Sequence, residues 1–323
     1  MKTDYPGTPQ ERDRWILDHR PARNAVDPQR AYATLVEEER SESGEIVEVA
    51  TIFLTNRECP WRCLMCDLWK NTLPGPTPPG AILAQLDAAL SWLAARRPAP
   101  RFIKLYNSGS FFDPRAIPPA DHAPIAERLR DFERVIVECH PSLIGDSTLR
   151  FRDRLQGRLE VAMGLETAHP DVLAKLNKRM TLDDFAQAAA RLRQEAIGLR
   201  AFVLVKPPFL DEAEGRWWCE RSIDFAMNCH ASVIVLIPTR AGNGALEALA
   251  GSGHFAPPRL ATLEAVLDYG IRLGRSRVFA DLWDLNVFSR CGACFDRRQS
   301  RLRRLNLAQQ METPIHCDAC AER

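Results

Sequence analysis

Two kinds of stretch alternate along residues 46–282 of this 323-residue chain. Short runs rich in Val, Ile and Leu are typical of buried strands, and between them apolar residues recur at the three- and four-residue spacing of helices. Strands that alternate with helices form a parallel sheet, because each helix returns the chain to the edge where the next strand begins. We expect strands at 47–54, 102–106, 135–139, 159–165, 199–205, 232–237 and 277–282, and helices at 81–96, 124–131, 147–155, 182–195, 212–227 and 258–274.

About six such units predict an α/β fold, a partial (β/α)6 TIM-like barrel, with an open doubly wound sheet as the alternative. In barrels the chemistry lies in the loops after the carboxyl ends of the strands. Residues 1–45 are polar and predict an N-terminal arm with a helical piece at 28–40, closed by the charged turn 39–45. We expect the barrel to occupy 46–284 and a small cysteine-rich module to occupy 285–323.

Composition narrows the class of protein. The chain is 46% apolar with a net charge of +1, which is typical of a globular protein and indicates neither a nucleic-acid nor a membrane partner. No run approaches the roughly 18 apolar residues of a membrane helix, and the first residues lack the apolar core of a signal peptide. Ten cysteines without a secretory signal favour a reducing cytoplasm and metal ligation. We expect a cytoplasmic protein.

Three cysteines follow the first expected strand. They are Cys59, Cys63 and Cys66, and their spacing is C-x3-C-x2-C. Structural zinc prefers C-x2-C pairs and four ligands, and disulfide frameworks belong to small secreted chains. An iron–sulfur cubane is usually held by four thiolates, so three leave one iron free for another ligand. We interpret the loop as an iron–sulfur site, with zinc and structural thiols as the alternatives.

This C-x3-C-x2-C loop after an apolar strand resembles that of the radical S-adenosylmethionine (radical SAM) superfamily. The resemblance implies a barrel of the radical SAM type, in which the three thiolates bind three irons of a 4Fe–4S cluster and S-adenosyl-L-methionine (SAM) chelates the fourth. It also implies a reductant such as flavodoxin or ferredoxin, whose electron cleaves SAM to methionine and a 5′-deoxyadenosyl radical that abstracts hydrogen from a substrate. Met65 departs from the family, where an aromatic residue commonly precedes the third cysteine.

The resemblance points to SAM contacts at two further strand ends. Ser108, Gly109 and Ser110 stand where the superfamily has a Gly-Gly-Glu-like stretch that contacts the SAM amino group. They lack its acid, so backbone carbonyls and hydroxyls become the expected acceptors, and a plain turn is the alternative. Glu166 ends the fourth expected strand and resembles the acid that meets the SAM ribose or amino group; the alternative is an acid at a helix N-terminus. No catalytic residue is assigned.

The stretch 47–240 resembles one subgroup in particular, the Elongator-type and archaeosine-forming radical SAM enzymes. Enzymes of that subgroup act on tRNA or on tRNA-bound precursors, so the resemblance implies tRNA as a substrate or partner. Lys178 and Arg179 either meet a substrate phosphate or carboxylate or are solvated. Cys139 is either a hydrogen donor or a small buried apolar residue. The resemblance lies in residues 108–114, 164–167, 177–178 and 204–210.

Two C-x2-C pairs lie near the C-terminus: Cys291, Cys294, Cys317 and Cys320. Each pair presents two thiolates from a tight turn, and their separation is close to that of four-cysteine zinc sites. Zinc is the first interpretation and a second iron–sulfur cluster is the other; His316 is a further candidate ligand. Five arginines within 297–304 predict a basic patch, used either for phosphate contact or as a solvated helix face.

Together these patterns favour a radical SAM enzyme with a C-terminal metal module, acting on a tRNA or a tRNA-bound modified nucleoside. One alternative is a radical SAM enzyme that acts on a free small molecule. Another is a non-catalytic, metal-stabilised nucleic-acid-binding protein, which explains the arginines but leaves the first three cysteines without a purpose.

Overall fold

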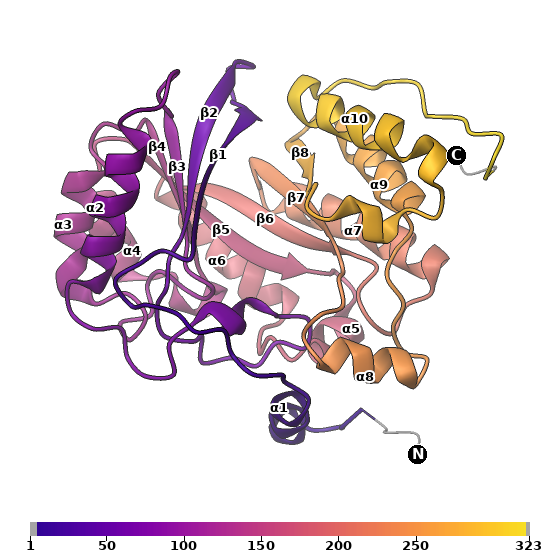
Figure 1. Cartoon of the computed structure of the whole chain (residues 1–323), viewed down its shortest axis with the longest axis horizontal. Coiled ribbons are helices and arrows are strands. Elements are labelled where there is room, and N and C mark those ends of the chain that lie inside the picture. Colours follow the sequence, from indigo (N-terminus) through magenta and orange to yellow (C-terminus); the bar gives the residue numbers. More distant parts are fainter. Residues whose placement is uncertain (1–4, 321–323) are drawn as a thin grey trace.

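A computed structural model describes residues 5–320 of the chain. Eight strands form one sheet in chain order, and the sheet curls into half a barrel (Figure 1). β2 to β8 run parallel, as predicted, and β1 is antiparallel to β2. The strands are β1 Ala33–Arg40, β2 Ile46–Phe53, β3 Phe102–Tyr106, β4 Arg134–Glu138, β5 Arg158–Glu166, β6 Gly198–Val205, β7 Val233–Pro238 and β8 Arg277–Ala280.

The helix predicted at 28–40 is wrong, because most of this segment is strand β1, which pairs with β2 along its whole length. The charged turn exists, but it joins two strands as a hairpin at 41–45. Alternate residues of a strand share one face, and Glu37 and Glu39 accordingly both bond Lys104 of β3, each at 2.8 Å. Their partner is distant in sequence, so the local pattern did not reveal the strand. The division of the chain into three parts stays a prediction.

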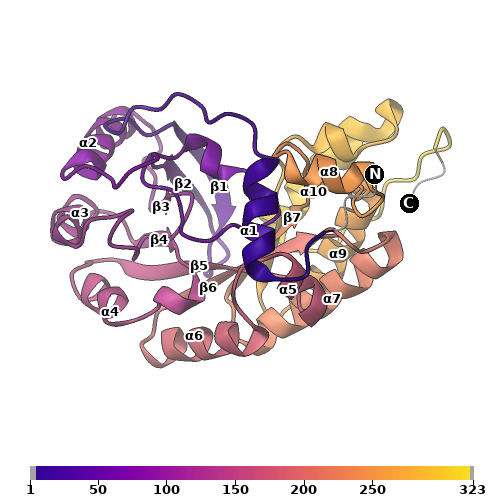
Figure 2. The same ribbon diagram turned by 90° about the horizontal axis from the view of Figure 1, so that it is seen from below.

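Helices that connect the parallel strands cover the outer face of the sheet (Figures 1 and 2). The predicted ones are confirmed with ends shifted by a few residues: α2 Ala81–Leu93, α3 His122–Arg128, α4 Asp146–Arg152, α6 Leu182–Gln194, α7 Glu212–Asn228 and α9 Leu260–Leu273. Four α-helices of the described residues lie outside the expected set: α1 Pro9–Asp18, α5 Pro170–Lys175, α8 Ala245–Gly251 and α10 Gly292–Ala308. Among residues 5–320, no helix is both long and apolar enough to cross a membrane.

The inner face of the sheet is charged toward the amino ends of its parallel strands. Buried Arg200 of β6 bonds Glu39 at 2.5 Å and Glu160 of β5 at 2.7 Å, and Arg134 of β4 bonds Glu160 at 2.9 Å. Burial alone would raise the pKa of Glu39, but the charges of Arg200 and Lys104 hold it well below its ordinary value. This layer of ion pairs fills one end of the half barrel and leaves the carboxyl ends of the strands as its mouth.

The last helix, α10 Gly292–Ala308, closes the free edge of β8. The side-chain amide of Asn306 donates to the carbonyl of Ala280 and accepts from its N–H, both at 2.8 Å. Gln309 makes the same two bonds to Val278 at 2.7 Å. These amides satisfy backbone groups that an edge strand would leave unpaired. Arg40 of β1 donates to a carbonyl of α10 at 3.1 Å, so the helix bridges the two edges of the sheet.

Candidate active site

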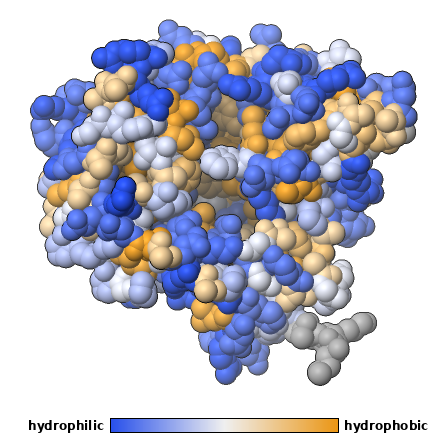
Figure 3. Space-filling view, in the orientation of Figure 1, coloured by the Kyte–Doolittle hydropathy of each residue, from blue (hydrophilic) through white to orange (hydrophobic). Residues whose placement is uncertain are grey.

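The carboxyl ends of β2 to β5 bring the predicted site residues of the barrel to one end of the molecule. The cysteine loop follows β2, and a Cβ atom on Gly109, after β3, would lie 3.3 Å from the Cβ of Cys59. Glu166 is the last residue of β5. The half barrel is also hollowed on its open side, where apolar residues line a depression between β1–β2 and β7–β8 (Figure 3). The structure thus places the expected residues side by side, and their roles stay predictions.

The cysteine loop is half-buried and held by two distant segments. The Leu64 N–H donates to the carbonyl of Leu176 at 2.9 Å, and the amide of Asn243 donates to the carbonyls of Leu64 at 2.7 Å and Cys66 at 3.2 Å. Burial raises the pKa of each of the three thiols to about 12. Bound iron replaces such protons with positive charge, so three half-buried thiols in one short loop suit three irons of a cluster.

A buried ion pair faces the cysteine loop. Lys178 Nζ lies 2.5 Å from Glu166 Oε1, and neither side chain is more than 11% exposed. A Cβ atom on Gly164 would lie 2.0 Å from Glu166 Oε1 and 2.2 Å from Lys178 Nζ, so this glycine makes room for the pair on the sheet. Glu166 has a φ of +65°, in the left-handed region that non-glycine residues rarely adopt. The alternative of a solvated Lys178 is wrong.

The helix-terminus alternative for Glu166 is also excluded. Glu166 belongs to strand β5, and the next helix, α5, begins only at Pro170. Burial alone would lower the pKa of Lys178, but the charges of Glu166 and Cys63 raise it above its ordinary value. The ammonium of Lys178 therefore remains charged beside the cysteine loop.

Sequence reasoning missed Glu138, the last residue of β4. Its carboxylate accepts a hydrogen bond from the backbone N–H of Asn107 at 2.9 Å. This bond and a second backbone hydrogen bond from Ser108 both lower the pKa of Glu138. Burial nevertheless raises its pKa to about 7. The available signal was the one used for Glu166, an acid that ends an apolar strand. The next residue, Cys139, is 3% exposed and lies in the apolar core, which favours a packing role.

The stretch 108–110 connects the cysteine loop to the end of β4. Ser108 has a φ of +53°, and Ser110 Oγ accepts a hydrogen bond from the His140 N–H at 2.9 Å. The ring of His140 stacks on Trp61 of the cysteine loop, with centroids 3.8 Å apart. Burial lowers the pKa of His140 to about 4, so its imidazole is neutral near pH 7. These contacts give the stretch a fixed place in the mouth of the half barrel.

The four C-terminal cysteines form a second cluster. Their sulfur atoms all lie within 4.8 Å of one another, and the pairs Cys291–Cys317 and Cys294–Cys320 are each 3.9 Å apart. The predicted four-thiol group is therefore assembled. His316 is a poor ligand candidate, because its side chain is 68% exposed and lies 3.2 Å from Asp318.

The arginine run beside this cluster is not a uniform basic patch. Arg298 and Arg301 are each 1% exposed and bond acids of α9: Arg298 bonds Glu264 at 2.8 Å, and Arg301 bonds Asp268 at 2.8 Å. Both alternatives for the run are therefore wrong for these two residues, which attach α10 to α9. Arg297, Arg303 and Arg304 are exposed.

No protein-family model matches the sequence. Over 240 residues the chain is 27% identical to archaeosine synthase subunit beta of Methanosarcina acetivorans, which covers 70% of this chain and 67% of that protein. Over 261 residues it is 24% identical to an uncharacterized protein of Methanocaldococcus jannaschii, which covers 77% of this chain and 72% of that one.

Two solved structures share the fold. The archaeal Elp3 of Methanocaldococcus infernus superposes with a TM-score of 0.51 at 13% identity, over 72% of this chain and 62% of that chain. Methylornithine synthase PylB superposes with a TM-score of 0.50 at 11% identity, over 69% of this chain and 62% of that chain. The chain thus spans less than two thirds of each, and both are radical SAM enzymes. These likenesses confirm the predicted fold.

Proposed function

We propose that this chain, which has the fold of the radical SAM enzymes, is an enzyme that cleaves SAM reductively at the mouth of its half barrel. One observation carries the proposal. The three thiols of the C-x3-C-x2-C loop follow the carboxyl end of β2, where Cys59 lies beside Gly109 and the charge of Lys178 acts on Cys59 and Cys63. A metal-stabilised binding protein would have no use for such a trio in that position.

Cys59, Cys63 and Cys66 would hold a 4Fe–4S cluster. When bound there and reduced by flavodoxin, ferredoxin or a similar donor, such a cluster would supply the electron for cleavage of SAM to methionine and a 5′-deoxyadenosyl radical. The residues around the loop keep it half-buried, which limits access of water to the cluster.

The charges of the mouth suit the amino-acid part of SAM, which carries an ammonium and a carboxylate. Glu138 and Glu166 offer carboxylates to the first, together with the hydroxyls and backbone carbonyls of Ser108, Gly109 and Ser110. Lys178 offers an ammonium to the second. Glu138 thereby supplies, from β4, the acid that the stretch after β3 lacks.

The substrate class we propose is a tRNA or a tRNA-bound modified nucleoside. The support is the likeness to a protein named archaeosine synthase subunit beta. The arginine run adds little, since two of its five members are buried in ion pairs. A free small molecule is the alternative substrate, and comparing 5′-deoxyadenosine release with and without bulk tRNA separates the two.

For the C-terminal cluster we propose one zinc ion. Two thiolates bound about 2.3 Å from one tetrahedral ion lie about 3.8 Å apart, close to the 3.9 Å of both measured pairs. A cubane places four irons and four sulfides between its thiolates and needs a wider spacing.

Anaerobic reconstitution with iron and sulfide tests the proposal. The wild type should bind about four irons and one zinc per chain, and should form 5′-deoxyadenosine from SAM and dithionite. Cys63→Ser should lose the iron and the product, whereas Cys229→Ser, a half-buried cysteine on the outer side of the sheet, should behave as the wild type. A folded wild type that binds tRNA but never cleaves SAM would establish the non-catalytic alternative.

A further inference from the structure

The N-terminal segment 5–24 crosses the mouth of the half barrel, and we call it the strap. Its helix α1 lies over the centre of this end of the molecule (Figure 2). Ile16 of α1 is 1% exposed and shares an apolar cluster with Leu64 of the cysteine loop. Asp13 accepts hydrogen bonds from Asn177 at 2.7 Å and Arg179 at 2.6 Å, the two neighbours of Lys178. The strap therefore contacts both the cysteine loop and the loop that carries Lys178.

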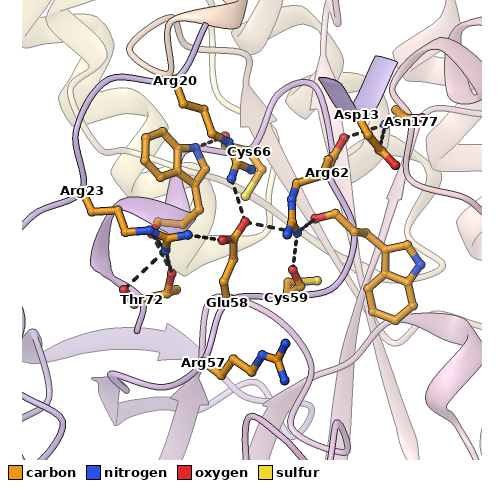
Figure 4. Close-up of polar contacts among 12 residues, drawn as sticks. Asp13, Arg20, Arg23, Arg57, Glu58, Cys59, Arg62, Cys66, Thr72 and Asn177 are labelled. Atoms are coloured by element: carbon orange, nitrogen blue, oxygen red, sulfur yellow. Dashed lines mark hydrogen bonds and ion pairs between the residues drawn. The ribbon is translucent and has the colours of Figure 1, made fainter. Parts of the chain in front are cut away.

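The strap also makes polar contacts with Glu58, the residue before Cys59 (Figure 4). Arg20 of the strap bonds Glu58 Oε1 at 2.7 Å, and Arg23 bonds Oε2. Arg62, inside the cysteine loop, lies 3.2 Å from the same carboxylate. The Glu58 side chain is 9% exposed, so water screens these pairs little.

Each arginine that meets Glu58 also holds another part of the loop. Arg62 donates to the carbonyl of Cys59 at 2.7 Å, and Arg23 donates to the carbonyl of Trp69 at 3.0 Å. Arg20 lies over the ring of Trp69, 4.5 Å from its centroid. One carboxylate thus organises both ends of the segment that contains the three cysteines.

The charges have a second consequence. Three guanidinium groups and one carboxylate leave an excess of positive charge beside three ligands that are negative when they bind a metal. Glu58 moderates that excess, and its removal would leave three cations facing the site. Removal of a negative charge near a redox centre favours the reduced form, because reduction adds an electron there.

We infer that Glu58 is the positioning residue of the cysteine loop: it clamps the loop to the strap in the conformation that retains the cluster, and its charge tunes the reduction potential. The inference rests on the proposed function for the presence of a cluster and goes beyond it in assigning the strap a role. Glu58 acts through the loop and does not touch a reacting atom.

The test uses the full-length, anaerobically reconstituted protein. Glu58→Gln removes the charge and keeps the shape, and Glu58→Asp keeps the charge on a shorter side chain. Glu42→Gln is the matched control, since Glu42 also bonds two arginines, Arg134 and Arg158, but at the opposite end of the half barrel. Iron release to a ferrous chelator measures loop opening, and an EPR redox titration measures the potential of the cluster.

We expect Glu58→Gln to release iron at least about tenfold faster than the wild type and to have a higher reduction potential, with Glu58→Asp restoring the potential toward the wild-type value. Glu42→Gln should match the wild type in both. Unchanged iron release and potential in Glu58→Gln would overturn the inference. A wild type that binds no cluster would instead refute the proposed function.

A second variant keeps the test decisive should Glu58→Gln fail to fold. Arg23 is 31% exposed, so Arg23→Ala removes one arm of the clamp at low cost to the fold. It should release iron faster than the wild type while its thermal unfolding is unchanged. Wild-type iron release in Arg23→Ala would overturn the inference even then.

Discussion

Gly164→Ala should weaken SAM binding while leaving the fold intact. The new Cβ would lie 2.0 Å from Glu166 Oε1 and 2.2 Å from Lys178 Nζ, whereas ordinary contact begins at 3.4 Å. The end of the Glu166 side chain must therefore move by about 1.4 Å and that of Lys178 by about 1.2 Å. Both are flexible, so they can move without displacing the backbone. The change acts on the position of the charges and leaves their number unaltered.

The expected loss follows from the bonds that the displaced pair would make to SAM. A hydrogen bond that involves a charged group contributes about 1.5–3 kcal/mol, so misplacing two of them costs about 3 kcal/mol, or roughly 100-fold in Kd. Equilibrium dialysis of labelled SAM against the anaerobic protein measures the Kd, and circular dichroism together with iron content reports the fold and the cluster.

Gly270→Ala is the matched control, because its Cβ would also meet a buried neighbour, Val278, at 2.9 Å, on the outer side of the sheet. It should lower thermal stability and leave the affinity for SAM unchanged. A Gly164→Ala protein that is folded, holds its iron and binds SAM as tightly as the wild type would refute the placement of SAM at the Glu166–Lys178 pair.

Three further predictions concern separate parts of the molecule. Because the pKa of Glu138 is raised to about 7, its side chain is a neutral carboxylic acid below that pH and a carboxylate above it. The affinity for SAM should therefore rise between pH 6 and pH 8, and Glu138→Gln should flatten this profile in the same dialysis. Cys294→Ser should reduce bound zinc from about one per chain to none and lower the unfolding temperature, while the iron content stays the same by elemental analysis. Arg301→Met strands the buried carboxylate of Asp268 and should cost about 3–5 kcal/mol in denaturant unfolding; the exposed Arg297→Met should change stability by less than about 0.5 kcal/mol.

The parallel strands were predictable because each is buried on both faces and appears as a short apolar run. β1 was not, since its glutamates are balanced by residues far along the chain: Glu37 by Lys104 and Glu39 by Arg200. A run of charges looks solvated until the fold brings counter-charges to it. The same physics turned Arg301 from an expected surface cation into a buried link to α9.

The residues of the candidate site also fall into those that the sequence revealed and those that only the fold revealed. The cysteine trio was found because metal ligation needs fixed local spacing, which the sequence displays directly. Glu138 went unassigned because its role depends on its neighbours: it bonds Asn107 in the loop after β3, 31 residues earlier in the chain. An acid at a strand end becomes a site residue when the strands on either side bring a ligand to it.

By itself, the sequence determined the alternation of strands and helices, the positions of both cysteine groups and the end of the sheet at which the first group lies. These follow from local periodicity and spacing. Only the tertiary structure decided which charges are paired: Lys178 with Glu166, and Glu58 with the arginines of the strap. The reason is that burial makes an unpaired charge costly, so the partner of each charge is selected by proximity in the folded chain, which spacing along the sequence does not encode.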